Sequence, residues 1–207
     1  TEFSIQCGEG SHIIGVSPFC MISVQFTENI VQCIHEQNGI GYGCPDMFVY
    51  TGIRIGVAAI KGLCDALGKK CVPVSTLEAL AYNLVGRRCT AVSVMDARCN
   101  QVYCAIFNVQ GETVNRLTED MALKIDDLGE MLKSYENIIF VGDGAKLCHK
   151  ALGYEKAPAN CEYQRGSSVC FAAMNHIDEA LESKALLPVY LRLPQAEREL
   201  KAKQNKL

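Results

Sequence analysis

The chain has 207 residues, of which 49% are hydrophobic and 21% are charged, and its formal net charge is −3. These values are typical of a soluble globular protein, and the length suffices for one substantial domain or two small lobes that share a core. The charge excludes a global positive field for nucleic acid, so any contact with RNA must be local or made through a partner. No run approaches the roughly 20 apolar residues that span a bilayer, and we expect a soluble, cytoplasmic protein.

Twelve cysteines are many for this length. The chain shows no secretory leader and no C-x-x-C pair, so the sequence indicates neither a disulfide scaffold nor the common zinc and thioredoxin spacings. We expect the cysteines to be small buried hydrophobic residues in a reducing compartment. The dipeptide Cys148-His149 is interpreted in the same way, as part of a helix rather than as a pair of metal ligands.

The basic residues are distributed unevenly along the chain. All 20 Lys and Arg lie at or beyond Arg54, whereas residues 1–50 contain five acidic residues and no Lys or Arg. Three explanations of this segment remain open, namely a truncated start, a divergent lobe and a reading-frame error. We predict that residues 1–50 are less ordered than residues 51–207, or differently folded.

From Thr51 onward the periodicity of the apolar residues predicts regular elements. Thr51–Leu67 is predicted as a helix that ends at Gly68, the expected residue for a C-cap. Cys71–Val74 is predicted as a short strand. Ser75 and Glu78 then form a capping box, in which each side chain satisfies a free backbone donor, at the start of a helix that ends near Leu84.

Thr90–Met95 and Gln101–Phe107 are predicted strands joined by a turn at Asp96–Asn100, and they should form an antiparallel hairpin. The other predicted elements are helices at Asp126–Lys133, Ala145–Leu152 and Ser168–Glu182, strands at Asn137–Val141 and Pro188–Arg192, and a turn at Gly142–Gly144. Strands and helices alternate, so the predicted class is α/β with a mixed sheet.

Two loops contain residues that could carry chemistry. Asp96 could be a metal-binding or general-base carboxylate, but the commoner role of Asp at this place is to close a turn, with Arg98 pairing with it or with a carbonyl. Gly142–Gly144 could hold a phosphate at the N-terminus of the following helix. Since the first 45 residues contain no Asp to help bind Mg²⁺, we predict a structural turn there instead. We assign no catalytic, cofactor-binding or metal-binding residue.

Four stretches in this order resemble the TsaB (YeaZ) family. They are Thr51–Gly62 (TGIRIGVAAIKG) with Val74–Leu80 (VSTLEAL) after it, Met95–Arg98 (MDAR) with Gln101–Tyr103 (QVY), Val141–Gly144 (VGDG), and Pro188–Arg192 (PVYLR) with Gln195–Arg198 (QAER). The chain departs from the family in lacking its opening D-T-S strand, and Phe48–Tyr50 stands where the family has G-P-G-S-F. Residues 1–50 therefore take nothing from the resemblance.

The resemblance implies an actin-like, ribonuclease H-like ATPase fold with two lobes and mixed sheets, of which the first lobe is atypical or incomplete here. On this basis residues 1–50 form an atypical N-terminal segment, residues 51–90 the remainder of the first lobe, and residues 91–207 the second lobe and a C-terminal tail.

The same resemblance implies a non-catalytic subunit. It would bind and activate the catalytic subunit TsaD, together with the ATPase TsaE, for threonylcarbamoylation of the tRNA adenosine next to the anticodon. ATP and Mg²⁺ are then expected on the catalytic partner, and tRNA is reached only through the complex. The alternative is an active nucleotide-dependent enzyme of the actin-like superfamily.

The predicted helix Thr51–Leu67 is the candidate for a partner interface. At about 100° per residue its small residues fall on one stripe, and an apolar face lies beside them. The stripe consists of Gly52, Gly56, Ala59, Leu63 and Ala66, and the apolar face of Ile53, Val57, Ile60, Cys64 and Leu67. Arg54, Lys61 and Asp65 are expected on the opposite side, facing water.

Glycine inside a helix costs about 1 kcal/mol relative to alanine, so the glycines of this stripe require a reason. Close packing within the chain is one, and close approach of a partner's helix is the other. The resemblance favours pairing with the catalytic subunit or with a second copy. The predicted interface is Gly52, Ile53, Gly56, Ala59, Ile60 and Leu63.

Overall fold

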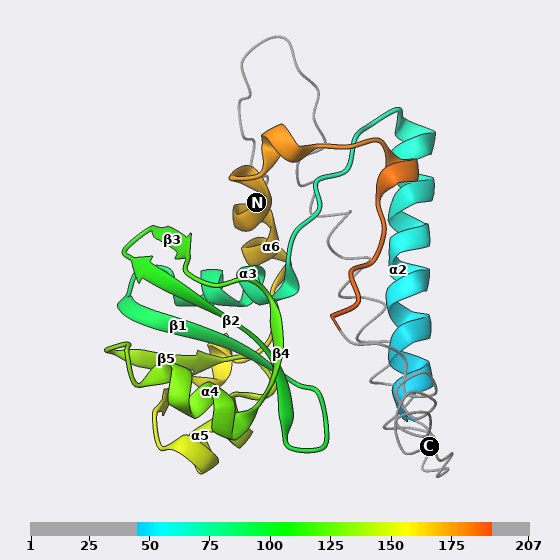
Figure 1. The fold of residues 1–207 in the computed structure, drawn as a ribbon. Coiled ribbons are helices and arrows are strands. Elements are labelled where there is room, and N and C mark those ends of the chain that lie inside the picture. The colour runs from blue at the N-terminus through cyan, green and yellow to red at the C-terminus, as the bar shows by residue number, and fades with distance from the viewer. Residues whose placement is uncertain (1–44, 192–207) are drawn as a thin grey trace.

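The computed structural model describes residues 45–191, with side chains from Arg54 onward. The predictions for the N-terminal segment and for the tail beyond Leu191 lie outside the described residues. Helix α2 (Pro45–Leu67) stands beside a six-stranded sheet that has helices on both faces (Figure 1). None of the helices within the described range is long and apolar enough to cross a membrane.

The sheet is built on the predicted hairpin. Strands β1 (Arg88–Asp96) and β2 (Gln101–Gln110) pair antiparallel, which confirms the hairpin. The strand order is β3-β2-β1-β5-β6, and β5 and β6 run parallel to β1. The remaining strands are β3 (Thr113–Arg116), β4 (Met121–Lys124), β5 (Ile138–Val141) and β6 (Glu155–Lys156). β3 and β4 share the outer edge of β2 and were not predicted, because four half-exposed residues leave little periodicity.

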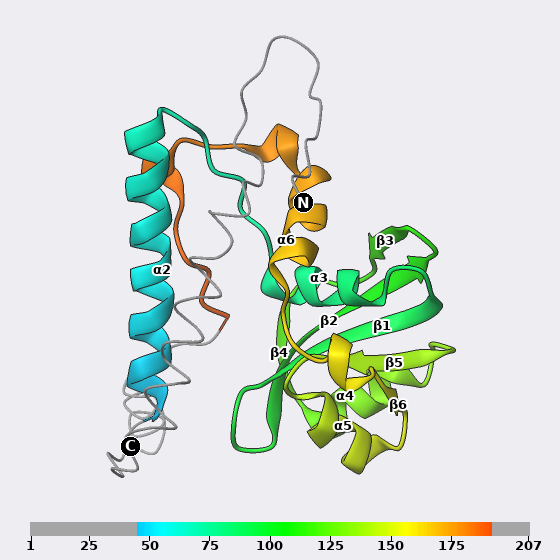
Figure 2. The same ribbon diagram turned by 180° about the vertical axis from the view of Figure 1, so that it is seen from behind.

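Alternation along β1 divides the interior into two layers. Ala91 belongs to the cluster under α3 (Thr76–Ala81), whereas Val92 belongs to the cluster under α4 (Ile125–Leu132) and α5 (Ala145–Leu152). α6 (Gly166–Met174) packs on α3, so α3 and α6 lie on one side of the sheet and α4 and α5 on the other (Figures 1 and 2). The predicted elements Asp126–Lys133, Asn137–Val141 and Ala145–Leu152 are confirmed within one or two residues, and α/β with a mixed sheet is the observed class.

Three predicted elements are wrong. Cys71–Val74 is not a strand and makes a single bridge, from Cys71 to Leu181, because Pro73 has no N–H to extend a ladder. The helix predicted at Ser168–Glu182 begins at Gly166 and ends at Met174, and the chain turns there through Asn175. Pro188–Leu191 is irregular rather than a strand, and it lies along α2, with no strand of the described residues beside it to pair with (Figure 1). Arg192, the last residue of the predicted strand, lies outside the described residues.

The capping box at the start of α3 forms in part. The N–H of Glu78 donates to Oγ of Ser75 at 3.4 Å, as predicted, but the Glu78 carboxylate does not return to the cap. Instead its Oε2 accepts from Nη2 of Arg116 at 3.1 Å, and only 8% of Glu78 is exposed. The predicted helix end at Leu84 is confirmed, because the 3₁₀ helix η1 (Tyr82–Leu84) continues α3.

Arg116 connects this carboxylate to a second one. Its Nη1 donates to Oδ1 of Asp120 at 2.6 Å, and the Oγ of Ser75 donates to the other Asp120 oxygen at 2.6 Å. The guanidinium also lies 4.8 Å from the centre of the Phe107 ring, a cation–π contact. The start of α3, the end of β3 and the loop before β4 are therefore joined by one polar network.

The eight described cysteines are free thiols, and most of them are buried. Burial raises the pKa of Cys104 to about 11 and that of Cys148 to about 12, so both stay protonated at neutral pH. The buried cysteines therefore behave as the small hydrophobic residues that the sequence predicts. Cys99 is the exception, because it is exposed at the hairpin turn.

Arg116→Met should lower the free energy of unfolding by about 2–4 kcal/mol, because it removes the permanently charged partner of the buried Glu78 carboxylate and leaves it only His176. Lys133→Met is the control, since Lys133 and Glu130 form an ion pair in which both side chains are exposed. It should change the stability by less than about 0.5 kcal/mol. Urea unfolding followed by circular dichroism measures both, and equal losses for the two variants would contradict the assignment.

Candidate functional site

Helix α2 carries all six residues of the predicted interface. It begins at Pro45, six residues earlier than predicted, and proline is favoured in the first turn because it has no N–H to leave unpaired. It ends as predicted at Gly68, which has φ +61°, and the N–H of Lys69 donates to the carbonyl of Cys64 at 2.9 Å. The end of α2 is therefore set by a left-handed glycine.

One face of α2 packs on residues 181–191, here named the C-terminal segment. Ile60 and Cys64 are buried in a small cluster with Cys71, and Leu181 and Leu186 pack against it. This cluster is separate from the two clusters of the sheet. The packing of α2 thus depends on a chain segment about 120 residues away in sequence.

Polar side chains fasten the C-terminal segment along the helix. Nζ of Lys61 donates to the carbonyls of Lys184 and Leu186, each at 3.2 Å, and Nε of Arg54 donates to Oη of Tyr190 at 3.1 Å. Asp65 accepts a hydrogen bond from the Oγ of Ser183.

Arg54 and Asp65 are exposed, as predicted, and Lys61 is half-buried. The prediction that the three lie opposite the packed face is corrected, because each bonds to the C-terminal segment. The helical pattern gave no indication of that segment.

The structure separates the six predicted interface residues. Ala59 is exposed, Leu63 is half-buried, and Gly56 and Ile60 are buried within the chain. Gly52 and Ile53 belong to the helix backbone, but their side chains are outside the described part. The six do not form one outward surface, and their role in binding a partner stays a prediction.

The outward line of α2 is made by small and apolar residues that overlap the predicted interface only at Ala59, and they are Ile55, Ala59, Gly62 and Ala66. Ile55 is 54% exposed. The outward line could have been found from the sequence. At about 100° per residue its four residues lie on the side of the helix opposite the centre of the predicted apolar face. The stripe of small residues predicted above lies instead at the border of that apolar face.

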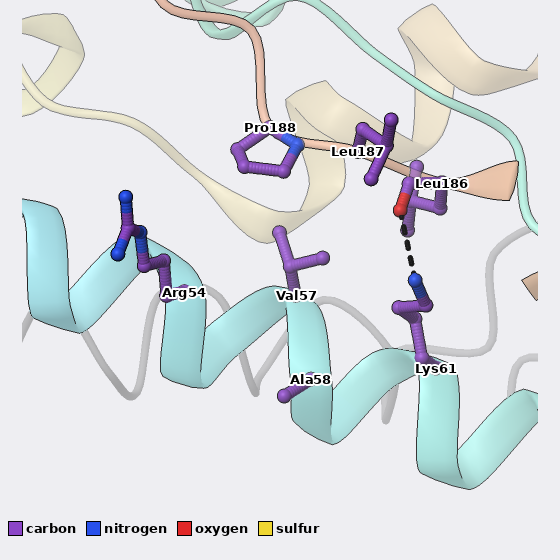
Figure 3. Close-up of a pocket in the computed structure, with 7 residues that line it drawn as sticks. All are labelled: Arg54, Val57, Ala58, Lys61, Leu186, Leu187 and Pro188. Carbon is purple, nitrogen blue, oxygen red and sulfur yellow. Dashed lines mark hydrogen bonds between the residues drawn. The ribbon is translucent and has the colours of Figure 1, made fainter. Parts of the chain in front are cut away.

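A shallow groove runs between α2 and the C-terminal segment (Figure 3). Its volume is about 210 Å³, and it is lined by Arg54, Val57, Ala58, Lys61, Leu186, Leu187 and Pro188. The Lys61 ammonium points across the groove to the carbonyl of Leu186. Beside the groove the segment exposes apolar side chains, with Leu187 at 71% and Val189 at 84%.

Asp96 closes the hairpin turn, which confirms the preferred structural role. Its Oδ1 accepts from the N–H of Arg98 at 2.8 Å, and its Oδ2 lies 3.4 Å from Nη1 of the same residue. Arg98, Cys99 and Asn100 all have positive φ, and the Asp96 carboxylate supports the first of them.

The Gly142–Gly144 loop lies next to this turn. Oδ1 of Asp143 accepts from the N–H of Asp96 at 3.2 Å, and the carboxylate also interacts with the N–H groups of Gly144 and of Asp143 itself. Although the residue's surface is exposed, neighbouring atoms crowd the carboxylate and remove part of its hydration, which raises the pKa of Asp143. The N–H of Gly144 also donates to the carbonyl of Val94 at 3.2 Å, so these backbone donors are already engaged within the chain.

Comparison with known proteins relates the whole described region to one group. The family model described as "TsaD: tRNA N6-adenosine threonylcarbamoyltransferase" matches residues 49–200. The tRNA threonylcarbamoyladenosine biosynthesis protein TsaB of Bacillus subtilis is 31% identical over 156 residues, which are 72% of this chain and 67% of that protein. The chain belongs to the TsaB (YeaZ) family.

Two solved structures from Pseudomonas aeruginosa share the fold. One is YeaZ, with a TM-score of 0.55 and 20% identity over 69% of each chain. The other is a protein described as similar to peptidase YeaZ, with a TM-score of 0.56 and 19% identity over 69% of this chain and 68% of that one. The family's actin-like, ribonuclease H-like fold is thereby the fold of this chain, and the predicted lobe boundaries stay a prediction.

Gly142→Ala tests whether the loop is shaped by packing. Gly142 has φ +113°, and a Cβ there would lie 2.1 Å from the carbonyl oxygen of Val94. The substitution should lower the free energy of unfolding by at least about 2 kcal/mol. Gly62→Ala is the control, because a Cβ on Gly62 meets nothing within 4 Å. It should be neutral or stabilising by up to about 1 kcal/mol. An unchanged denaturation midpoint for Gly142→Ala would show that the loop is not held by this contact.

Proposed function

We propose that this chain is a non-catalytic subunit in tRNA threonylcarbamoyladenosine biosynthesis, which binds and activates the catalytic subunit TsaD together with the ATPase TsaE. The pathway is supported by family membership and by the name of the Bacillus subtilis relative. The non-catalytic role is supported by one observation above all, the position of Asp143.

The Asp143 carboxylate makes the Gly142–Gly144 loop a poor phosphate site. It accepts the N–H of Asp96, and the N–H of Gly144 donates to the carbonyl of Val94, so these donors are not free for a ligand. The Asp96 carboxylate lies close enough to raise the pKa of Asp143, which adds a second negative charge beside the loop. A phosphate would meet two carboxylates where it needs donors and cations. In this proposal ATP and Mg²⁺ bind the catalytic partner, and no cofactor is assigned to this chain.

Helix α2 supplies the partner surface in this proposal. Its outward line of Ile55, Ala59, Gly62 and Ala66 is apolar and has small side chains at three of four positions, which allows another helix to approach closely. The face that carries Ile60 is already used by the C-terminal segment. The partner is TsaD, with homodimerisation through the same line as the competing outcome, and tRNA is reached only through the complex.

Ala59→Arg should abolish pairing with TsaD and leave the chain folded, because Ala59 is exposed and in the middle of the line. Ala151→Arg is the matched control, an exposed alanine on α5 that receives the same side chain. Circular dichroism checks the fold, and sedimentation velocity measures the chain alone and with TsaD. If Ala59→Arg still pairs with unchanged affinity, α2 is not the interface, and if only self-association is lost, the line serves a homodimer.

The isolated chain should hydrolyse no ATP, and ATP with Mg²⁺ should not raise its melting temperature, since a ligand stabilises a protein only by binding the folded state. Threonylcarbamoylated tRNA should form only when TsaD, TsaE and this chain are combined. Steady ATP turnover by the isolated chain that Asp143→Ala abolishes would favour the nucleotide-dependent enzyme and contradict the proposal.

A further inference from the structure

Two connecting segments join α2 and the C-terminal segment to the sheet and its helices. They are residues 68–75, which lead from α2 to α3, and residues 175–180, which lead from α6 to the C-terminal segment. Cys71 of the first segment and Leu181, the residue that directly follows the second, form a bridge in which each N–H donates to the other's carbonyl at 2.8 Å. Both views show α2 standing apart from the sheet (Figures 1 and 2). Its position relative to the sheet therefore depends on how these segments are held.

Both segments end on the same polar network. The first ends at Ser75, whose Oγ donates to Asp120 at 2.6 Å. The second begins with Asn175, which donates to Oη of Tyr82, and with His176, whose Nε2 lies 2.8 Å from Oε1 of Glu78. Arg116 joins the two ends, since it bonds to both Asp120 and Glu78.

His176 is the titratable member of this network that changes charge near neutral pH. Its Nε2 faces Glu78 on α3, and its Nδ1 lies 2.8 Å from Oε1 of Glu179 in the 3₁₀ helix η3 (Ile177–Glu179). The other oxygen of Glu78 accepts a hydrogen bond from Arg116 on β3. The other charged or titratable groups of the network are Asp120, in the loop before β4, and Tyr82, the acceptor of Asn175. An imidazolium can donate to both carboxylates, whereas a neutral imidazole can donate to only one.

We propose that His176 is a proton-operated latch on the second connecting segment. The imidazolium clamps this segment between Glu78 and Glu179, and loss of its proton frees the segment so that α2 and the C-terminal segment can move relative to the sheet. The latch depends only on contacts within the chain, so it stands whichever partner α2 binds.

The direction of the pH dependence follows from the two carboxylates. The hydrogen bond to Glu179, followed by the one to Glu78, raises the pKa of His176 above its ordinary value of 6.5. A raised pKa means that protonation stabilises the folded arrangement. The latch is therefore fully closed below the ordinary value and opens as the pH rises through the raised pKa. Only about a quarter of the His176 side chain is exposed.

Amide hydrogen exchange at Cys71 and Leu181 reports on the latch, because these N–H groups join the first connecting segment to the residue that directly follows the second. The quantity to compare is the protection factor, which removes the pH dependence of intrinsic exchange, with the amides of β5 as the internal reference. In the wild-type chain it should fall several-fold between about pH 5.5 and about pH 8.5. In His176→Gln it should be low at both values, and in the control His149→Gln, on α5, the wild-type profile should remain.

Glu179→Gln gives an independent test, since Glu179 is exposed and its loss should not unfold the chain. It should lower the pKa of His176, observed by NMR of the imidazole, and shift the fall in protection to lower pH by the same amount. Protection at Leu181 that stays constant while His176 titrates would overturn the latch. A His176→Gln profile identical to wild type would do the same, and if that variant does not fold, the Glu179→Gln shift decides.

Discussion

The contact between Arg116 and Glu78 is the constraint on which the arrangement of this chain depends. A carboxylate that is only 8% exposed must be paired, and Arg116 pairs it from the far edge of the sheet. The same guanidinium holds Asp120, which holds Ser75 at the start of α3. Since His176 bonds to the other oxygen of Glu78, the two segments that carry α2 are both attached to Arg116, one through Asp120 and the other through Glu78.

This arrangement separates two tasks within one chain. The sheet, with α3 to α6, forms two well-filled layers and holds the Gly142–Gly144 loop against the carbonyl of Val94. Helix α2 has only a small cluster of its own, and its outward line is apolar. A sheet with packed helices that carries α2 on two connecting segments suits a subunit that presents α2 to a partner. In the same arrangement the latch at His176 can change the position of α2 relative to the sheet.

Much of the candidate site could be predicted because its elements are local. The helix end at Gly68, the turn at Asp96 and the start of α3 at Ser75 follow from capping and turn chemistry that neighbouring residues decide. The orientation of α2 could not be predicted in the same way. The motifs that contain Arg54 and Tyr190 are far apart in the sequence, and these two residues, 136 positions apart, form a hydrogen bond. The residues around Arg54 do not indicate this contact. The pattern also could not indicate that the chain's own C-terminal segment packs against Ile60, and the role of the predicted interface residues in binding a partner stays a prediction.

The sequence by itself determined the family, the mixed α/β class and the positions of the hairpin, α4, α5 and β5, because these depend on periodicity and on short-range turn and cap residues. The tertiary structure decided which face of α2 is exposed, and that Asp143 accepts the N–H of Asp96 in the neighbouring hairpin turn. It also decided that the Glu78 carboxylate bonds to Arg116 and His176 rather than to its own helix cap. Each of these depends on which residues distant in the chain come within hydrogen-bond distance. The periodicity of apolar residues does not indicate these contacts, because it shows which face of a segment is buried and not which distant residues cover that face.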